Sequence, residues 1–251
     1  MERYFEINEG GHNIRCKLYY NNIRDIKKVV IFCHGFAGHK DNGAANKFAD
    51  RVLAKYKDIA VLIFNWPCHG DDVKKTLKLD DCMEYLSTVV QYAKTQYSTE
   101  EVYCYATSFG GYLTLKYIAG EGNPFKKIAL RCPAVNMFSV LTNTIMNLEE
   151  FEEIQKGKSV PVGFDRKIDV SPQFLNELHS EDIQLKDYRN YADDILILHG
   201  TEDEVVPFEA VNSFADANLI EFISVEGADH RFQNPVCMEL ATKRVIEFFG
   251  F

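Results

Sequence analysis

Residues 101–111 read EVYCYATSFGG, and they place one serine where a strand pattern gives way to a helix pattern. The sequence predicts a buried strand over Glu101–Tyr105 and a helix over Phe109–Ala119. A sharp turn between a strand and a helix holds a serine hydroxyl exposed at the end of a sheet. Ser108 is therefore our candidate nucleophile.

Small residues two before and two after the serine keep such a turn free of clashes. Gly110 fits this requirement, and Ala106 stands where glycine is more usual. The alternative interpretation is structural: Ser108 caps a helix, and the glycines serve close packing.

Strand and helix patterns alternate on both sides of Ser108. The strands are continuous apolar runs, which indicates burial on both faces of a parallel sheet. We therefore predict an α/β fold, a mostly parallel sheet with helices on both faces, in one domain over residues 1–251. The predicted strands are 28–33, 59–64, 127–132, 194–198 and 221–225, the helices include 41–56, 80–97 and 234–249, and a hairpin (3–8 and 13–20) precedes them.

The segment 133–191 interrupts this alternation, because it is too long for one crossover helix. Its patterns predict a helix over Val140–Gln155, a hairpin over Ser159–Val170 and a short helix over Gln173–Leu178. We interpret it as a small inserted lid. Its surplus apolar residues are expected to form the wall of a binding pocket: Met137, Phe138, Leu141, Ile145, Met146 and Phe151.

A serine nucleophile needs a histidine base, and that base needs an acid to orient it. His230 follows the last predicted strand, and Asp203 follows the strand before it, so both lie at the same sheet edge as Ser108. Glu202 and Glu204 flank Asp203 and are alternatives for the acid. His34, His69 and His199 also end strands, where a structural role is open to each of them.

The negative charge that develops during attack on a carbonyl needs two backbone N–H donors. We assign them to Phe109, directly after the serine, and to Phe36 in the glycine-rich loop 34–38. That loop lacks the lysine and the spacing of a phosphate-binding loop. Cys33-His34 and Cys68-His69 are rival pairs of nucleophile and base, but neighbouring side chains at a strand end point apart, and Cys33 is expected in the core.

Composition narrows the function classes. The chain of 251 residues carries a formal net charge of −9, which disfavours nucleic acid and anionic membranes as partners. Its seven cysteines are scattered, and no metal-binding spacing or apolar membrane span is present. We expect a cytoplasmic protein with reduced thiols, without metal or organic cofactor.

Together these motifs resemble the α/β-hydrolase superfamily over nearly the whole chain. The chain is most similar in style to small bacterial serine esterases with a short lid, such as cinnamoyl (feruloyl) esterases and monoacylglycerol-lipase-like enzymes. The resemblance implies the fold and ester hydrolysis, and it departs from the family at Ala106 and at residues 66–68. Its motifs are His34-Gly35-Phe36, residues 65–70 (NWPCHG), the Ser108 turn, His199-Gly200, Asp203, Val206-Pro207 and Asp229-His230.

The sequence thus predicts a serine esterase that cleaves a small-molecule ester through an acyl-enzyme, with cinnamoyl (feruloyl) or short-acyl esters as candidate substrates. Thioesterase, monoacylglycerol lipase and serine peptidase activities are alternatives on the same core. A fold without catalysis, used to bind a small ligand, is an alternative of another class. The sequence does not indicate an oligomeric state.

Overall fold

A computed structural model describes all 251 residues and contains one eight-stranded sheet in the order β1-β2-β4-β3-β5-β6-β9-β10. β1 and β2 form the antiparallel hairpin, and β2 pairs antiparallel with β4. From β4 to β10 every neighbouring pair is parallel, as the apolar runs predicted. The strands are β1 (Glu2–Glu9), β2 (His12–Tyr20), β3 (Lys28–Cys33), β4 (Ile59–Phe64), β5 (Val102–Thr107), β6 (Ile128–Arg131), β9 (Ile195–Gly200) and β10 (Glu221–Val225).

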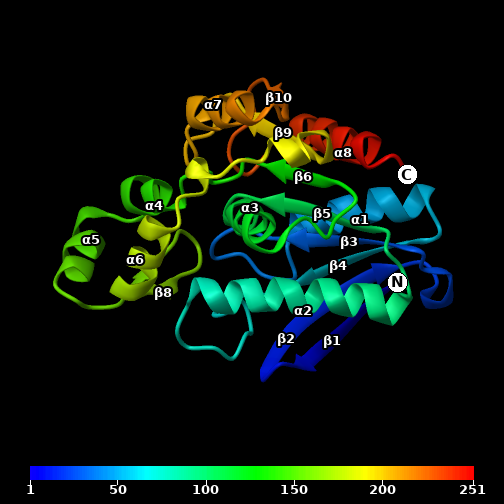
Figure 1. Ribbon diagram of the computed structural model, residues 1–251, viewed down its shortest axis with the longest axis horizontal. Coiled ribbons are helices and arrows are strands. Elements are labelled where there is room, and N and C mark those ends of the chain that lie inside the picture. The colour runs from blue at the N-terminus through cyan, green and yellow to red at the C-terminus, as the bar shows by residue number, and fades with distance from the viewer.

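Helices cover both faces of this sheet (Figure 1). The alternation along β3 shows why: Val29 and Ile31 pack into one apolar cluster, and Val30 and Phe32 pack into another on the opposite face. The first cluster lies under α2 (Leu79–Tyr97), α3 (Phe109–Glu121) and α7 (Phe208–Asn218). The second lies under α1 (Gly43–Lys55) and α8 (Pro235–Phe249). No helix combines the length and the apolar character needed to cross a membrane.

Figure 1 shows the helices of the segment 133–191 together at the end of the molecule opposite both termini. The segment contains α4 (Met137–Val140), a π-helical turn (Leu141–Ile145), α5 (Leu148–Gln155) and α6 (Pro172–Ser180). It also contains β7 (Val160–Val162) and β8 (Ile168–Val170), which form the predicted antiparallel hairpin. Short 3₁₀ turns complete the chain at Ile23–Asp25, Ile183–Leu185 and Arg189–Asp194.

The single helix predicted over Val140–Gln155 is wrong. The chain leaves the helical conformation at Met146, and a new helix begins after Asn147. The Asn147 side chain accepts a hydrogen bond from the Glu150 amide, and the Glu150 carboxylate accepts one from the Asn147 amide. This reciprocal cap satisfies two amides at a helix start, so it stabilises a break inside an otherwise helical pattern.

Candidate active site

Ser108 lies between β5 and α3 in a backbone conformation that few residues other than glycine adopt. Its φ is 51° and its ψ is −117°. Its amide donates a hydrogen bond to the carbonyl of Arg131 on β6 at 3.0 Å, which fixes the turn to the neighbouring strand. A Cβ atom at Gly110 would collide with the backbone carbonyl of Cys33, so glycine permits α3 to begin this close to β3. Backbone strain of this kind is common where a side chain must be held exposed for chemistry.

The structure brings Ser108, His230 and Asp203 into one chain of hydrogen bonds. Nε2 of His230 lies 3.0 Å from Oγ of Ser108. Nδ1 of the same ring lies 2.8 Å and 3.0 Å from the two carboxylate oxygens of Asp203. Because an ionised carboxylate only accepts, Nδ1 carries the hydrogen, and Nε2 is left to accept from the serine hydroxyl.

The surroundings of Asp203 keep its carboxylate ionised and fixed. Burial raises its pKa, but hydrogen bonds from His230, from the Cys132 thiol and from the backbone outweigh this and hold the pKa below its ordinary value. The amides of Val205 and Val206 donate to Oδ1 at 2.9 Å and 2.8 Å. Of the two acids flanking Asp203, Glu204 accepts only from the backbone amide of His230, at 3.2 Å.

The two amides assigned to the oxyanion lie beside the serine. A Cβ atom built on Gly35 would stand 3.2 Å from Cβ of Ser108, so the loop that carries the Phe36 amide lies close against Ser108. The Phe36 amide has no hydrogen-bond partner within the protein. The Phe109 amide is in the first turn of α3, where a helix offers no acceptor. Both donors are thus available to a ligand.

The other strand-end histidines are buried. Burial and the neighbouring His69 lower the pKa of His34, and burial lowers that of His69 to about 4. Nδ1 of His34 contacts the Gly35 carbonyl at 2.8 Å, so this ring holds the loop that carries Phe36. Burial also lowers the pKa of His199, whose Nε2 lies 3.0 Å from the Val206 carbonyl and 3.3 Å from Asp203. Cys33 is fully buried in the core, as expected.

A cavity of about 510 Å³ opens over Ser108 and His230. Its walls come from the loop after β3, the start of α1, the ends of β5 and β6, and the loop before α8. The hairpin of the segment 133–191 contributes Gly163 to Arg166. Of the six apolar residues expected as a wall, only Ile145 lines the cavity. Met137, Leu141 and Met146 pack in the core instead, because helix-spaced apolar residues bury against the sheet first.

Two clusters in the structure combine side chains of the types that bind metals: Cys132, Asp203 and His230 in the site, and His12, Asp81 and Glu84 elsewhere. In the first, Asp203 already accepts from His230 and from two backbone amides. Burial and the nearby Asp203 raise the pKa of the Cys132 thiol, so this sulfur keeps its proton. A protonated thiol is a poor ligand, and the arrangement suits an orienting acid better than a metal.

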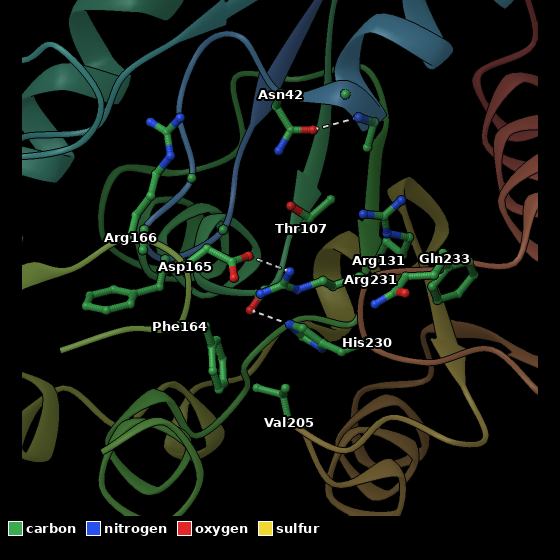
Figure 2. A pocket seen from close by; sticks show the side chains of 18 of the residues that line it. Asn42, Thr107, Arg131, Phe164, Asp165, Arg166, Val205, His230, Arg231 and Gln233 are labelled. Carbon is green, nitrogen blue, oxygen red and sulfur yellow. Dashed lines mark hydrogen bonds and ion pairs between the residues drawn. The ribbon is translucent and has the colours of Figure 1, made fainter. Parts of the chain in front are cut away.

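Two features of the site were missed by sequence reasoning. Arg131 lines the cavity although it lies in a strand. Arg231 reaches Asp165 of the hairpin at 2.8 Å, an ion pair that Figure 2 shows across the pocket. Neither depends on a motif, since each arises from segments that meet only in the fold.

Comparison with known families gives one match, in which the model of the prolyl oligopeptidase family covers residues 64–250. This range includes Ser108, Asp203 and His230, and it spans most of the chain. No curated protein is similar enough in sequence to count as a match.

Solved structures show the same fold. The chain is similar to Est1E of Butyrivibrio proteoclasticus with ferulic acid bound, at 20% identity and a TM-score of 0.73, with 97% of each chain covered. It is also similar to the α/β hydrolase GrgF of a Penicillium species, at 16% identity and a TM-score of 0.75, with 99% and 98% covered. The esterase domain of a Rhodothermus marinus protein matches at 18% identity and a TM-score of 0.68, with 98% and 96% covered. The fold is that of the α/β hydrolases.

Proposed function

Because this chain belongs to the prolyl oligopeptidase family and is a serine hydrolase, we propose that it cleaves carboxylic esters through an acyl-enzyme. One observation carries the proposal: the hydrogen-bond chain from Ser108 through His230 to Asp203, which ends at a strained serine facing a cavity. A ligand-binding protein without catalysis would have no need for a serine held in this conformation.

The proposed reaction has two steps. Oγ of Ser108 bonds to the ester carbonyl carbon while its proton passes to Nε2 of His230. The amides of Phe36 and Phe109 hold the resulting oxyanion, and Asp203 stabilises the charged imidazole. His230 then gives its proton to the alcohol as the carbon–oxygen bond breaks. Water then attacks the acyl-enzyme in the same way, with His230 again accepting and returning a proton. This step releases the acid and restores the serine hydroxyl.

For the substrate we propose short-acyl or cinnamoyl (feruloyl)-type esters. The cavity of about 510 Å³ accommodates a small molecule, and the rings of Phe36, Phe164 and Phe232 lie in its walls. We further propose that the segment 133–191 acts as a lid within a single domain, since its hairpin supplies part of the cavity wall. Closing such a wall excludes water and shapes the site.

A serine peptidase is the second candidate, and the family match favours it, since the family is named for a peptidase. The two activities share the acyl-transfer core and differ in the leaving group, an alcohol or an amine. Only turnover measurements separate them.

The test compares hydrolysis of acetyl, butyryl and feruloyl esters with that of a proline-containing peptide amide. We expect ester turnover by the wild type and a loss of roughly 10⁴-fold or more in Ser108→Ala. Ser224→Ala, which changes an exposed serine on β10, is the matched control and should keep the wild-type rate. Faster cleavage of the peptide than of every ester would favour the second candidate. Full ester turnover by Ser108→Ala would contradict the proposal.

A further inference from the structure

A buried cation without an acidic partner lies beside the nucleophile. Arg131 ends β6, where it pairs in register with Thr107 of β5, the residue before Ser108. It lines the same cavity as Ser108 and is only 6% exposed. Figure 2 shows Arg131 beside Thr107, at the wall of the pocket.

The protein neutralises this guanidinium poorly. Nη1 lies 3.1 Å from the sulfur of Met238, and the group stands over the Phe232 ring, 5.1 Å from its centroid. Nε has no hydrogen-bond partner, and no carboxylate oxygen lies within ion-pair distance of the group. A buried charge without a counter-charge is destabilising, and hydrophobic residues of similar size are usually a better solution for stability alone. A guanidinium at this place in the cavity wall therefore suggests that a bound ligand supplies the missing negative charge.

Most of the charged side chains that line the cavity are cationic. Besides Arg131 they are Lys47, Arg166 and Arg231, and Asp165 is the only carboxylate in the lining. Asp165 already pairs with Arg231 at 2.8 Å. This cavity is cationic although the chain as a whole carries a net charge of −9.

We propose that the substrate carries a carboxylate that pairs with Arg131 when its ester lies at Ser108. A planar guanidinium binds a planar carboxylate through two parallel hydrogen bonds, and one buried cation matches one monoanion. Arg131 and Ser108 line one cavity of about 510 Å³, so the acid and the ester of one small substrate can contact the two groups together. This inference rests on the proposed ester hydrolysis and narrows it to short acidic esters.

The test uses two pairs of esters that differ in charge and not in shape. Monoethyl succinate against ethyl levulinate places the acid on the acyl side. 4-Acetoxybutanoate against 5-acetoxypentan-2-one places it on the alcohol side. In each pair a methyl ketone replaces the carboxylate, and released ethanol or acetate is measured. For at least one pair we expect kcat/KM of the wild type to be at least tenfold higher for the anion. Equal or better hydrolysis of both neutral esters would overturn the inference and leave the proposed function intact.

Variants assign the preference to Arg131. In Arg131→Met the ratio of kcat/KM for the anionic ester to kcat/KM for the neutral ester should fall to about one. In Arg131→Lys this ratio should lie between those of Arg131→Met and the wild type. Arg51→Met is the control: Arg51 lies one helical turn beyond Lys47 on α1, does not line this cavity, and should leave the ratio unchanged. Circular dichroism checks that each variant is folded. A wild-type ratio in a folded Arg131→Met would contradict the assignment.

A binding measurement separates this inference from the proposed function. Isothermal titration of Ser108→Ala with the preferred anionic ester requires no turnover. We expect at least tenfold weaker binding when Arg131→Met is added to Ser108→Ala, and equal affinities would overturn the inference. If the wild type hydrolyses neither these four esters nor the acetyl, butyryl and feruloyl esters, the proposed function fails. Titration with monoethyl succinate and with 4-acetoxybutanoate then still decides whether the anion site exists.

Discussion

Asp203 accepts hydrogen bonds from the imidazole of His230 and from the amides of Val205 and Val206 at the same time. Asp203→Asn keeps an oxygen for the amides, but its NH₂ group cannot accept from Nδ1. The ring then adopts the other tautomer, and Nε2 no longer accepts the serine proton. We expect kcat to fall by roughly 10⁴-fold with the fold intact, as measured by ester turnover and circular dichroism.

The neighbouring acid provides the control for this prediction. Glu204 accepts only from the backbone amide of His230, so Glu204→Gln should change kcat by no more than a few fold. If Glu204→Gln were as inactive as Asp203→Asn, the assignment of the orienting acid to Asp203 alone would be wrong.

At the scale of single residues, order along the chain predicted Ser108, Asp203 and His230, because each follows a strand that the apolar runs reveal. Arg131 could not be identified in this way. It ends an apolar strand without belonging to a motif, and its place next to Thr107 follows from the pairing of β6 with β5. Strand pairing is a property of the whole sheet, and no local pattern encodes it.

At the scale of elements, the contact between α3 and β3 determines where Ser108 lies. Gly110→Ala would place a methyl group against the Cys33 carbonyl, so α3 must move or the turn must open. We expect the free energy of unfolding to fall by about 1–3 kcal/mol and activity to fall with it. Urea unfolding and ester turnover measure the two effects.

Another glycine in the same helix gives the opposite expectation. A Cβ atom at Gly120 meets nothing within 4 Å, and the residue is helical and exposed. Gly120→Ala should therefore raise the free energy of unfolding by about 0.4–1 kcal/mol and leave turnover unchanged. Equal effects of the two substitutions would show that the close approach at Gly110 does not matter.

The β7–β8 hairpin is the element expected to set substrate preference. Its turn supplies four residues to the cavity wall, and the pair between Arg231 and Asp165 ties it to the loop of His230. Replacing Ser159–Val170 by a short turn should change the ranking of bulky against short acyl esters more than the rate for the smallest ester. An unchanged ranking in a folded variant would assign the hairpin a purely structural role.

Element boundaries were predicted best where composition changes sharply. The strands of the parallel sheet are runs of apolar residues, and their positions agree with the structure to within a few residues. Inside the segment 133–191 the helical spacing continues across Asn147, and the break depends on side chains that cap the backbone. Such a cap competes locally with helix continuation, and periodicity does not report it.

At the scale of the whole molecule, buried histidines make stability depend on pH. In the unfolded chain a histidine takes up a proton at about pH 6.5. In the folded protein the lowered pKa values keep His34, His69 and His199 neutral below that pH. The unfolded state then binds more protons, so stability is complete above that pH and falls below it. For His69, whose pKa is lowered to about 4, the loss between pH 7 and pH 5 is roughly 2 kcal/mol. Asp203, with its lowered pKa, stabilises the fold at both of these pH values, and its contribution is lost only at more acid pH.

Urea unfolding at pH 7 and pH 5, at constant ionic strength, measures this effect. For the wild type we expect a clearly lower free energy of unfolding at pH 5 than at pH 7. In His69→Phe this difference between the two pH values should be smaller by roughly 2 kcal/mol. His179→Gln, a change at an exposed histidine, should keep the wild-type difference. Equal stabilities of the wild type at the two pH values would contradict the account of the buried histidines.

The most direct test of the central claim is to identify the serine that reacts. The folded protein is treated with a fluorophosphonate, which phosphonylates activated serine hydroxyls, and the adduct is located by mass spectrometry of its peptides. We expect a single adduct on Ser108, absent from Ser108→Ala and formed much more slowly in His230→Gln. An adduct on another serine, or undiminished labelling of Ser108→Ala, would contradict it.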